Sequence, residues 1–245
     1  MVDHAILARS FENSGTDYDR YRPGFPAAAV DVVLPGRVGR VLDLGAGTGK
    51  LTERLVDRAD QVVAVEPAAS MLDVLRRKLP EVSAVEGRAE RIPVADASID
   101  VVTVAQAFHW FDRDRACAEI ARVLVAEGVL GLLWNRADPR CAWDRQCHAI
   151  AHPAVDAQDR TSATADGLPG FALLENRTIA WDERITRSDY LRRWATVSSF
   201  LVADAPTRAD LVRRIESVLD TDSDTRGRDV LLLPHVADVF VYQRA

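Results

Sequence analysis

VLDLGAGTGKLTERL, residues 41–55, starts as an apolar strand, passes through a glycine-rich turn and continues as an amphipathic helix. A turn this tight requires residues without a side chain. Gly45 allows a sharp exit from the strand, and Gly47 lets a ligand approach the backbone. The helix that follows directs its free N–H groups and the positive end of its dipole at the same place. The stretch therefore predicts a ligand site where strand, turn and helix meet.

The register of the glycines separates the ligands that use such turns. A dinucleotide-binding turn requires G-x-G-x-x-G, which would place its third glycine where Lys50 stands. A phosphate loop requires G-x-x-x-x-G-K-[ST], but counting back from Gly49 gives Leu44, and Leu51 follows the lysine. Both patterns fail. The G-x-G-x-G form preceded by Asp43 resembles the turns that bind S-adenosylmethionine, with an ordinary glycine-rich turn as the alternative.

Two further features follow at the spacing that a nucleoside site requires. Glu66 ends an apolar run about 20 residues after the first glycine, where dinucleotide folds place the acid that binds ribose hydroxyls. A carboxylate can accept from both hydroxyls at once, although a solvated acid at a strand end is the alternative interpretation. Ala89 and Glu90 follow the next strand, at the edge where ligands of such sheets collect. They are candidates for an adenine slot.

The pattern of residues 40–135 alternates between short apolar runs and helical segments, which predicts a parallel sheet built from βαβ units. Strands are predicted at residues 40–44, 61–66, 82–86, 99–105 and 129–134. Helices are predicted at residues 51–59, 68–79 and 113–125. The later segments are predicted as a helix at 139–152, a loop or cover at 153–170, a strand at 171–185, helices at 188–194 and 208–219, and a last strand at 229–243, interrupted at Pro234.

The composition fits one α/β domain with a substrate-covering segment, since 48% of the 245 residues are hydrophobic and 28% are charged. The net charge of −6 argues against nucleic-acid binding, which needs a positive field. Residues 1–25 lack the pattern of a secretory signal, and no apolar run approaches the roughly 20 residues of a membrane helix. The three cysteines show no CxxC spacing. We therefore expect a cytoplasmic protein without membrane insertion.

Four strings together resemble the class I S-adenosylmethionine-dependent methyltransferases: VLDLGAGTGKLT, VVAVEPAASML, GRAERIPVADASIDVVTVAQAFHWFD and EIARVLVAEGVLGLLW. They cover about residues 39–135 in the order of that family, and the string YRPGFP before them also resembles it. The subgroup that they resemble includes the small-molecule methyltransferases of ubiquinone/menaquinone biosynthesis and of trans-aconitate. Lys50 departs from the pattern, because small or polar residues are frequent at that position. Members of one family share the cofactor site but differ in the segments that cover the substrate, so the resemblance is less specific for the substrate.

The resemblance implies a Rossmann-like, doubly wound sheet of seven strands, mostly parallel with an antiparallel last strand. Within a single methyltransferase domain, residues 1–38 would form an N-terminal lid, 39–135 the cofactor-binding core, 136–228 the substrate-covering helices and strand, and 229–245 the final strand. It places Asp43, Gly45 and Gly47 near the methionine moiety, Glu66 on the ribose, and Ala89 and Glu90 on the adenine. The complete set expected at the cofactor is Asp43, Gly45, Ala46, Gly47, Thr48, Gly49, Glu66, Pro67, Met71, Ala89, Glu90 and Gln106.

The reacting groups are expected at the ends of the first and fourth strands. His109 could deprotonate a hydroxyl or an acidic carbon, since its ordinary pKa lies near neutrality, or it could orient the substrate. Trp110 could line the pocket or pack beneath the next helix. Tyr18, Tyr21 and Arg22 precede the first strand, in a segment that could fold over the cofactor or the substrate.

A metal is not expected. Cys141, His148 and His152 would share one face of a helix over residues 139–152, but a fourth zinc ligand is not evident and methyl transfer needs none.

These features predict transfer of a methyl group from S-adenosylmethionine to oxygen or carbon of a small organic molecule. A tRNA or protein methyltransferase is one alternative. The acidic composition argues against an RNA substrate. The string AQAFHW, residues 105–110, also differs from the Asn/Asp-Pro-Pro-aromatic string common in enzymes that methylate DNA or protein glutamine. A protein that binds the cofactor without catalysis is the other alternative.

Overall fold

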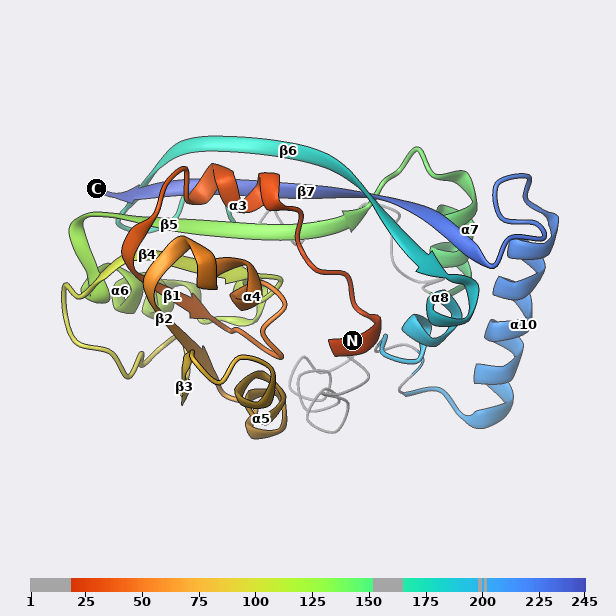
Figure 1. Ribbon diagram of the computed structural model, residues 1–245, viewed down its shortest axis with the longest axis horizontal. Helices are drawn as coiled ribbons and strands as arrows, with labels where there is room; N and C mark the ends of the chain where they lie inside the picture. The colour runs from red at the N-terminus through yellow and green to blue at the C-terminus, as the bar shows by residue number, and fades with distance from the viewer. Residues whose placement is uncertain (1–18, 152–164, 198–199, 201) are drawn as a thin grey trace. The chain divides into compact units, whose positions relative to one another are not determined.

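The computed structural model describes residues 19–151, 165–197, 200 and 202–245. Seven strands form one sheet in the order β3-β2-β1-β4-β5-β7-β6 (Figure 1). Their bounds are β1 Val38–Leu44, β2 Ala59–Glu66, β3 Ser83–Glu86, β4 Ile99–Ala105, β5 Leu124–Ala137, β6 Phe171–Thr186 and β7 Val230–Arg244. β7 runs antiparallel to both β5 and β6, whereas the other neighbouring strands pair in parallel. The predicted fold class is therefore confirmed.

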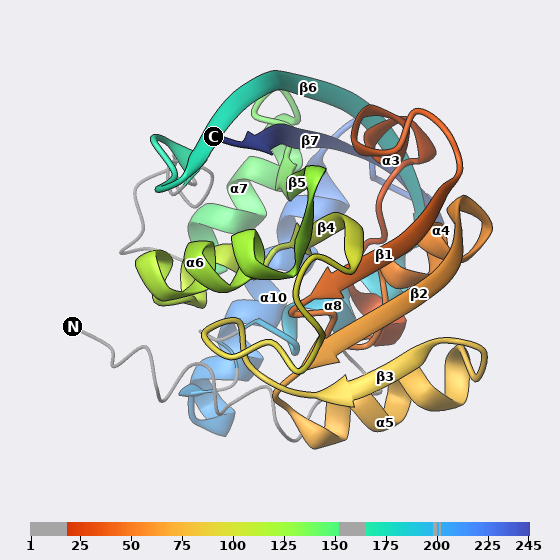
Figure 2. The same cartoon turned by 90° about the vertical axis from the view of Figure 1, so that its left-hand side faces the viewer.

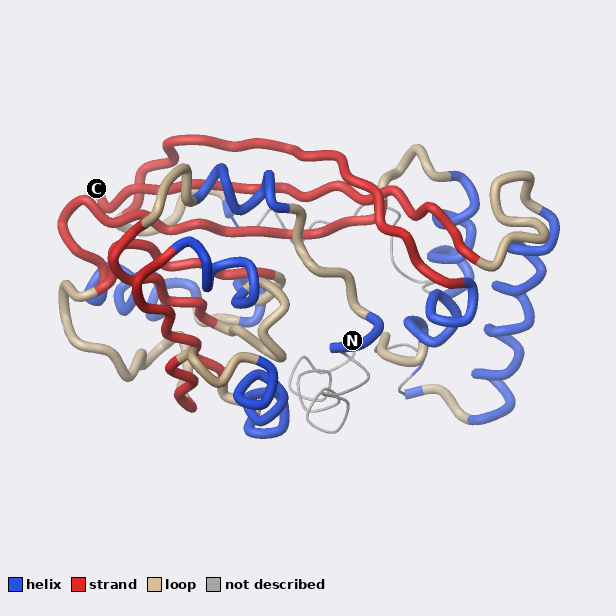
Figure 3. Tube along the Cα trace, viewed as in Figure 1, coloured by secondary structure: helices blue, strands red, loops and turns tan. Residues whose placement is uncertain are grey.

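Helices connect most of the strands along the chain, and three of them lie between residues 142 and 221 (Figure 3). The α-helices are α3 Ala27–Val33, α4 Thr52–Leu55, α5 Ala69–Lys78, α6 Arg113–Val123, α7 Ala142–Ala151, α8 Arg187–Trp194 and α10 Ala205–Thr221. Two 3-10 turns are η1 Val56–Arg58 and η2 Phe108–Trp110. Every helix within the described part of the chain is too short or too polar to traverse a lipid bilayer.

The position of β1 in the sheet creates the place where a ligand can bind. β1 pairs with β2 on one side, with Leu44 opposite Val65, and with β4 on the other, with Asp43 opposite Thr103. The chain order reverses at this point, so the connections after β1 and β4 lead away from each other. Ligands of open α/β sheets bind at such a switch point, outside the carboxyl ends of the strands.

The chain divides into two compact units. Of the described residues, 24–135, 165–179 and 237–245 form the sheet unit, and 19–23, 136–151, 180–197, 200 and 202–236 form the helical unit. In the sheet unit, α6 buries Ile120 and Val123 against Leu42 of β1 on one face of the sheet (Figure 2). α3 lies against the other face, where Gly131 gives it room: a Cβ at this position would stand 2.4 Å from Cγ1 of Val33.

The helical unit has its own core, formed by α7, α8 and α10 with the adjoining ends of β6 and β7. Tyr190 and Trp194 of α8 pack edge to face, and Trp143 of α7 packs edge to face on the same tyrosine. The Tyr190 hydroxyl donates to buried Asp144 Oδ1 at 2.6 Å, and burial raises the pKa of this phenol. Asp204 caps α10 by accepting a bond from the backbone N–H of Thr207.

The five strands predicted in residues 40–135 are present. Three predicted elements, one helix and two strands, differ from the structure in their extent. The helix predicted at residues 51–59 ends as an α-helix at Leu55 and tightens into the 3-10 turn η1, because β2 begins at Ala59. β5 extends well beyond both ends of its predicted range. β7 is continuous through Pro234, whose carbonyl accepts from the backbone N–H of Asp138 at 3.3 Å. A proline is tolerated in a strand where its missing N–H is not needed.

Candidate functional site

The turn after β1 has the backbone that its glycines predict. Gly45, Gly47 and Gly49 adopt positive φ angles of 72°, 56° and 84°. A Cβ at Gly45 would lie 2.7 Å from the Cβ of Ala107 and 3.3 Å from the ring of Phe111, so only glycine fits there. The turn after β1 therefore lies close against the side chains of Ala107 and Phe111, in the segment after β4.

The N–H groups of this turn are largely used inside the protein. Gly45 and Ala46 both donate to the carbonyl of Val65, at 2.8 and 3.1 Å, and Gly49 donates to the carbonyl of Ala46 at 2.9 Å. Gly47 donates to a carboxylate oxygen at 2.9 Å. A phosphate-binding turn needs such N–H groups to be free for phosphate oxygens. The geometry therefore agrees with the sequence, in which the glycine spacing does not match the phosphate-loop pattern.

The carboxylate that accepts from Gly47 belongs to Glu66, at the end of β2. Its Oε2 accepts from the Gly47 N–H at 2.9 Å, and its Oε1 accepts from the Ala68 N–H at 2.9 Å. Burial, which leaves 7% of the residue exposed, raises the pKa of Glu66, while the two N–H bonds oppose the rise. An ionised carboxylate has about four acceptor positions, so these two bonds leave capacity for two hydroxyl donors. Pro67, between Glu66 and Ala68, is exposed.

Asp43 lies beneath the turn, on β1. Thr52 Oγ1 donates to its Oδ2 at 2.6 Å, and Thr103 Oγ1 donates to its Oδ1 at 3.1 Å. Burial raises the pKa of Asp43 to about 6, against the opposing effect of the two hydroxyls. The carboxylate is therefore mostly ionised at neutral pH and ties the first helical turn after the glycines to β4.

Replacing Asp43 by asparagine is expected to change how stability depends on pH. The folded-state pKa of about 6 exceeds the ordinary value of 3.8, so protonation favours the folded state. The stability contributed by the protonated group is complete below pH 3.8 and is lost as pH rises through about 6. Relative to Asp43→Asn, the wild-type protein should therefore lose about 2.4 kcal/mol of unfolding free energy between pH 4 and pH 7. Urea unfolding across this range checks it; a constant difference between the two proteins would contradict it.

The remaining residues expected at the cofactor lie in two groups. Met71 is buried beside the turn, its Sδ 3.8 Å from the place that a Gly47 Cβ would occupy. Thr48 is also buried, and its hydroxyl has no hydrogen-bond partner among residues 19–151, 165–197, 200 and 202–245. Ala89 is buried in the core of the sheet unit, and Glu90 Oε1 accepts from the backbone N–H of Asp112 at 2.9 Å.

Gln106, directly after β4, has a positive φ of 55°, which is uncommon for a residue with a side chain. Its Nε2 donates to the carbonyl of Asn135 at 2.6 Å. The side chain of Asn135 in turn donates to the carbonyl of Gly24 at 2.6 Å. Strained backbone of this kind persists where the surroundings fix it, often at functional sites. The role of Asn135 was not predicted; the one signal in the sequence is a polar residue that ends the apolar run 129–134.

His109 lies in the turn η2 that follows. The indole Nε1 of Trp134 donates to its Nδ1 at 3.5 Å, a long bond, and its ring lies 4.9 Å from that of Trp110. If Nδ1 accepts from the indole, the neutral imidazole carries its proton on Nε2. Trp110 is 39% exposed, so it does not pack beneath the next helix, whereas Phe111 packs edge to face on Phe108.

The expected lid residues that are described belong to the helical unit. The carbonyl of Tyr21 accepts from Arg193 Nε at 2.6 Å, and its hydroxyl accepts from Arg192 Nη1 at 3.3 Å. Arg22 Nη2 donates to the carbonyl of Thr196 at 2.9 Å. Tyr18 lies outside the described residues. The contact of these three residues with cofactor or substrate stays a prediction.

The residues considered as metal ligands have other contacts. Cys141 is buried, and burial raises the pKa of its thiol to about 11. His148 Nε2 lies 3.6 Å from Asp144 Oδ2, and its ring packs on Trp194. His152 lies outside the described residues.

Comparison with known proteins agrees with this geometry. Residues 42–132 match the family described as "Methyltransferase domain". An uncharacterized methyltransferase of Mycobacterium tuberculosis is 40% identical over 231 residues, which are 94% of this chain and 93% of that protein. A solved structure of a type II methyltransferase from Anaeromyxobacter dehalogenans is 26% identical, with a TM-score of 0.72 over 91% of this chain and 98% of the other. The chain belongs to the class I S-adenosylmethionine-dependent methyltransferases.

Proposed function

We propose that the protein transfers a methyl group from S-adenosylmethionine to oxygen or carbon of a small organic molecule. The observation that carries the cofactor assignment is the Glu66 carboxylate, which two backbone N–H groups hold at the end of β2 beside the glycine turn. It faces the switch point of the sheet with acceptor capacity for two ribose hydroxyls. The turn itself keeps few N–H groups for phosphate, which suits a sulfur nucleoside better than a nucleotide.

The cofactor would be held by residues from three successive connections of the sheet unit. The turn at residues 45–49 would lie along the methionine moiety with Asp43 beneath it, and Glu66 would bind the ribose. Met71, Ala89 and Glu90 would surround the adenine. The remaining members of the proposed site are Ala46, Thr48, Pro67 and Gln106.

When bound, S-adenosylmethionine supplies the methyl group, whose bond to sulfur breaks as a bond to the acceptor forms. The protein then has to align the acceptor with that methyl group and exclude water. Gln106 and His109, after β4, are the proposed contacts on the acceptor side, because Gly45 and Ala107 bring this segment against the glycine turn. Tyr18, Tyr21, Arg22 and Trp110 are the proposed substrate-side residues.

A small organic acid is the kind of acceptor that we favour. A relative from Geobacter sulfurreducens, named malonyl-[acyl-carrier protein] O-methyltransferase, is 33% identical over 147 residues, or 53% of this chain and 52% of that protein. Its name supports a carboxyl oxygen as acceptor, which would need no general base. We propose the cytoplasm as the compartment, since Cys117, Cys141 and Cys147 are buried free thiols.

His109 is proposed to act on the acceptor through its Nε2. With Nδ1 accepting from Trp134, the Nε2–H can donate to the acceptor oxygen and orient it. We expect His109→Ala to lower kcat by about tenfold, the effect of one lost hydrogen bond to a charged group, and His109→Gln to retain more activity because its amide can also donate. Steady-state kinetics from pH 6 to 9 measures both. Equal losses in the two variants, with removal of an acidic limb present in the wild type, would instead indicate a general base.

The experiment that tests the function is a labelled-methyl assay against a library of small metabolites weighted toward carboxylic acids. The expected result is transfer of label to one or a few related acids, with S-adenosylhomocysteine formed in equal amount. Transfer only to RNA or protein, or no binding of S-adenosylmethionine at millimolar concentration, would overturn the proposal.

A further inference from the structure

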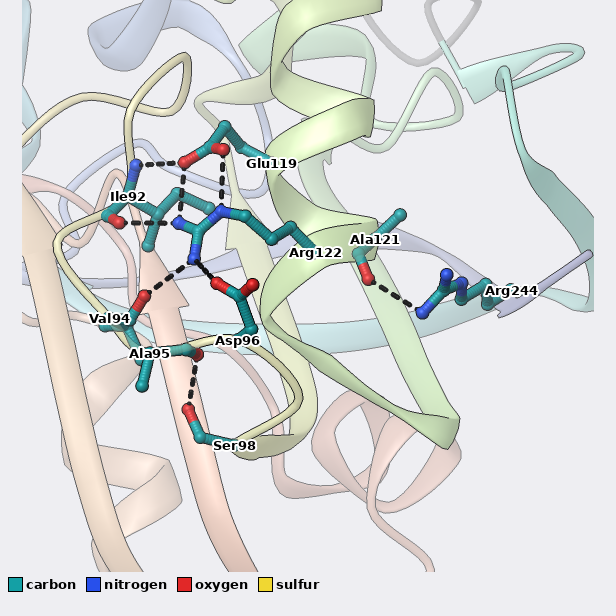
Figure 4. Close-up of polar contacts among 9 residues, drawn as sticks. All are labelled: Ile92, Val94, Ala95, Asp96, Ser98, Glu119, Ala121, Arg122 and Arg244. Carbon is teal, nitrogen blue, oxygen red and sulfur yellow. Dashed lines mark hydrogen bonds and ion pairs between the residues drawn. The ribbon is translucent and has the colours of Figure 1, made fainter.

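Arg122, in the last turn of α6, has all five N–H donors of its guanidinium engaged (Figure 4). Nη1 donates to the carbonyl of Val94 at 2.9 Å and to Asp96 Oδ1 at 2.6 Å. Nη2 donates to the carbonyl of Ile92 at 2.9 Å and to Glu119 Oε2 at 2.7 Å, while Nε donates to Glu119 Oε1 at 2.8 Å. A lysine could not reproduce this planar fork of donors.

Glu119, one turn earlier on α6, completes the arrangement. Its Oε2 also accepts from the backbone N–H of Ile92 at 2.8 Å. The hydrogen bond from Arg122 holds the pKa of Glu119 below its ordinary value, so the pair is ionised at neutral pH. The end of the helix contributes backbone bonds as well, because the N–H groups of Ala97 and Ser98 donate to the last carbonyls of α6.

The segment held in this way, residues 87–98, is the connection from β3 to β4. It begins beside the proposed ribose ligand, where the Gly87 N–H donates to the carbonyl of Glu66 at 3.3 Å. It is tied to the other end of α6 through Glu90, which accepts from the N–H of the helix-capping residue Asp112. The segment therefore follows α6 and is fixed at both ends of that helix. Ala89 and Glu90, the proposed adenine contacts, lie within it.

We infer that Arg122 and Glu119 form a clamp that sets base recognition by holding residues 87–98 against α6. They are positioning residues, since they bind this backbone and not the cofactor. The inference rests on the proposed function, which assigns the adenine to this connection. Besides the two bonds between them, Arg122 and Glu119 make four hydrogen bonds to residues 92–96, which is more than a surface ion pair, which usually contributes little. Loss of the clamp should thus affect the adenine more than the rest of the cofactor.

The test compares two nucleosides by titration calorimetry: S-adenosylhomocysteine, and S-inosylhomocysteine, which has a carbonyl in place of the adenine amino group. In Arg122→Lys, which keeps the charge but loses the fork, we expect binding of the adenosyl compound to weaken by about tenfold. Binding of the inosyl compound should change by less than about twofold, so that base selectivity falls. Glu119→Gln should change selectivity in the same direction, and it tests the clamp if Arg122→Lys does not fold.

Arg115→Met is the matched control, since it removes an exposed guanidinium from the same helix and should leave both affinities unchanged. Thermal unfolding of each variant identifies those that are folded. Unchanged base selectivity in both folded clamp variants, or equal losses for both nucleosides, would overturn the clamp. A wild-type protein that binds neither nucleoside would overturn the proposed function itself, so the two failures are distinguishable.

Discussion

Glu66→Ala is expected to weaken binding of S-adenosylhomocysteine by about a hundredfold or more. The substitution removes the proposed acceptor of two ribose hydroxyls and also the two bonds that fix Gly47 and Ala68. Each bond to a charged acceptor contributes about 1.5–3 kcal/mol, and 1.4 kcal/mol corresponds to tenfold in affinity. Calorimetric titration of the purified protein measures the effect directly.

Two further variants make this result specific. Glu66→Gln keeps the shape, but its amide can accept from only one of the two N–H groups, so an intermediate loss is expected. Glu86→Ala is the matched control: Glu86 pairs in register with Glu66 on the neighbouring strand and is exposed. Binding by Glu66→Ala as tight as that of Glu86→Ala would show that the ribose is not held here.

Gly45→Ala is expected to lower the unfolding free energy by about 3 kcal/mol. The φ angle of 72° costs an L-residue about 1–2 kcal/mol, and a Cβ only 2.7 Å from that of Ala107 adds an overpacking cost of about 1–3 kcal/mol. The displaced segment after β4 should also lose its proposed contact with the acceptor. Urea unfolding measures the loss of stability, and the methyl-transfer assay measures the loss of turnover.

Two other glycines calibrate this prediction. Gly47→Ala shares the positive φ, but its Cβ would meet only the Met71 sulfur at 3.8 Å, so a smaller loss of stability is expected. At Gly36 a Cβ would meet no atom within 4 Å, which makes Gly36→Ala the control. If Gly45→Ala proved as stable as Gly36→Ala, the close approach of the two connections would be wrong.

The sequence predicts the strands around the site well because buried parallel strands are continuous apolar runs, as in VVTV at residues 101–104. The glycine turn and Glu66 could be found from spacing alone. The turn needs residues that accept positive φ, and the acid has to stand at the end of the next strand. These are local requirements, and local requirements leave a trace in the sequence.

The contacts that join distant segments could not be predicted in this way. Asn135 bonds to Gln106 and to Gly24, which are 29 and 111 residues away. Arg122 is one of many arginines, and its five bonds depend on how the connection before β4 folds back on α6. Trp110 resembles a core residue in sequence, but 39% of it is exposed in the turn η2. Tertiary packing decides each of these.

The most direct test of the proposed site is a crystal structure of the protein with S-adenosylhomocysteine bound. The proposed site requires both ribose hydroxyls within about 2.5–3.0 Å of the Glu66 carboxylate, with the thioether beside the turn at residues 45–49. A nucleoside bound elsewhere, or a Glu66 side chain that makes no contact with the sugar, would contradict it.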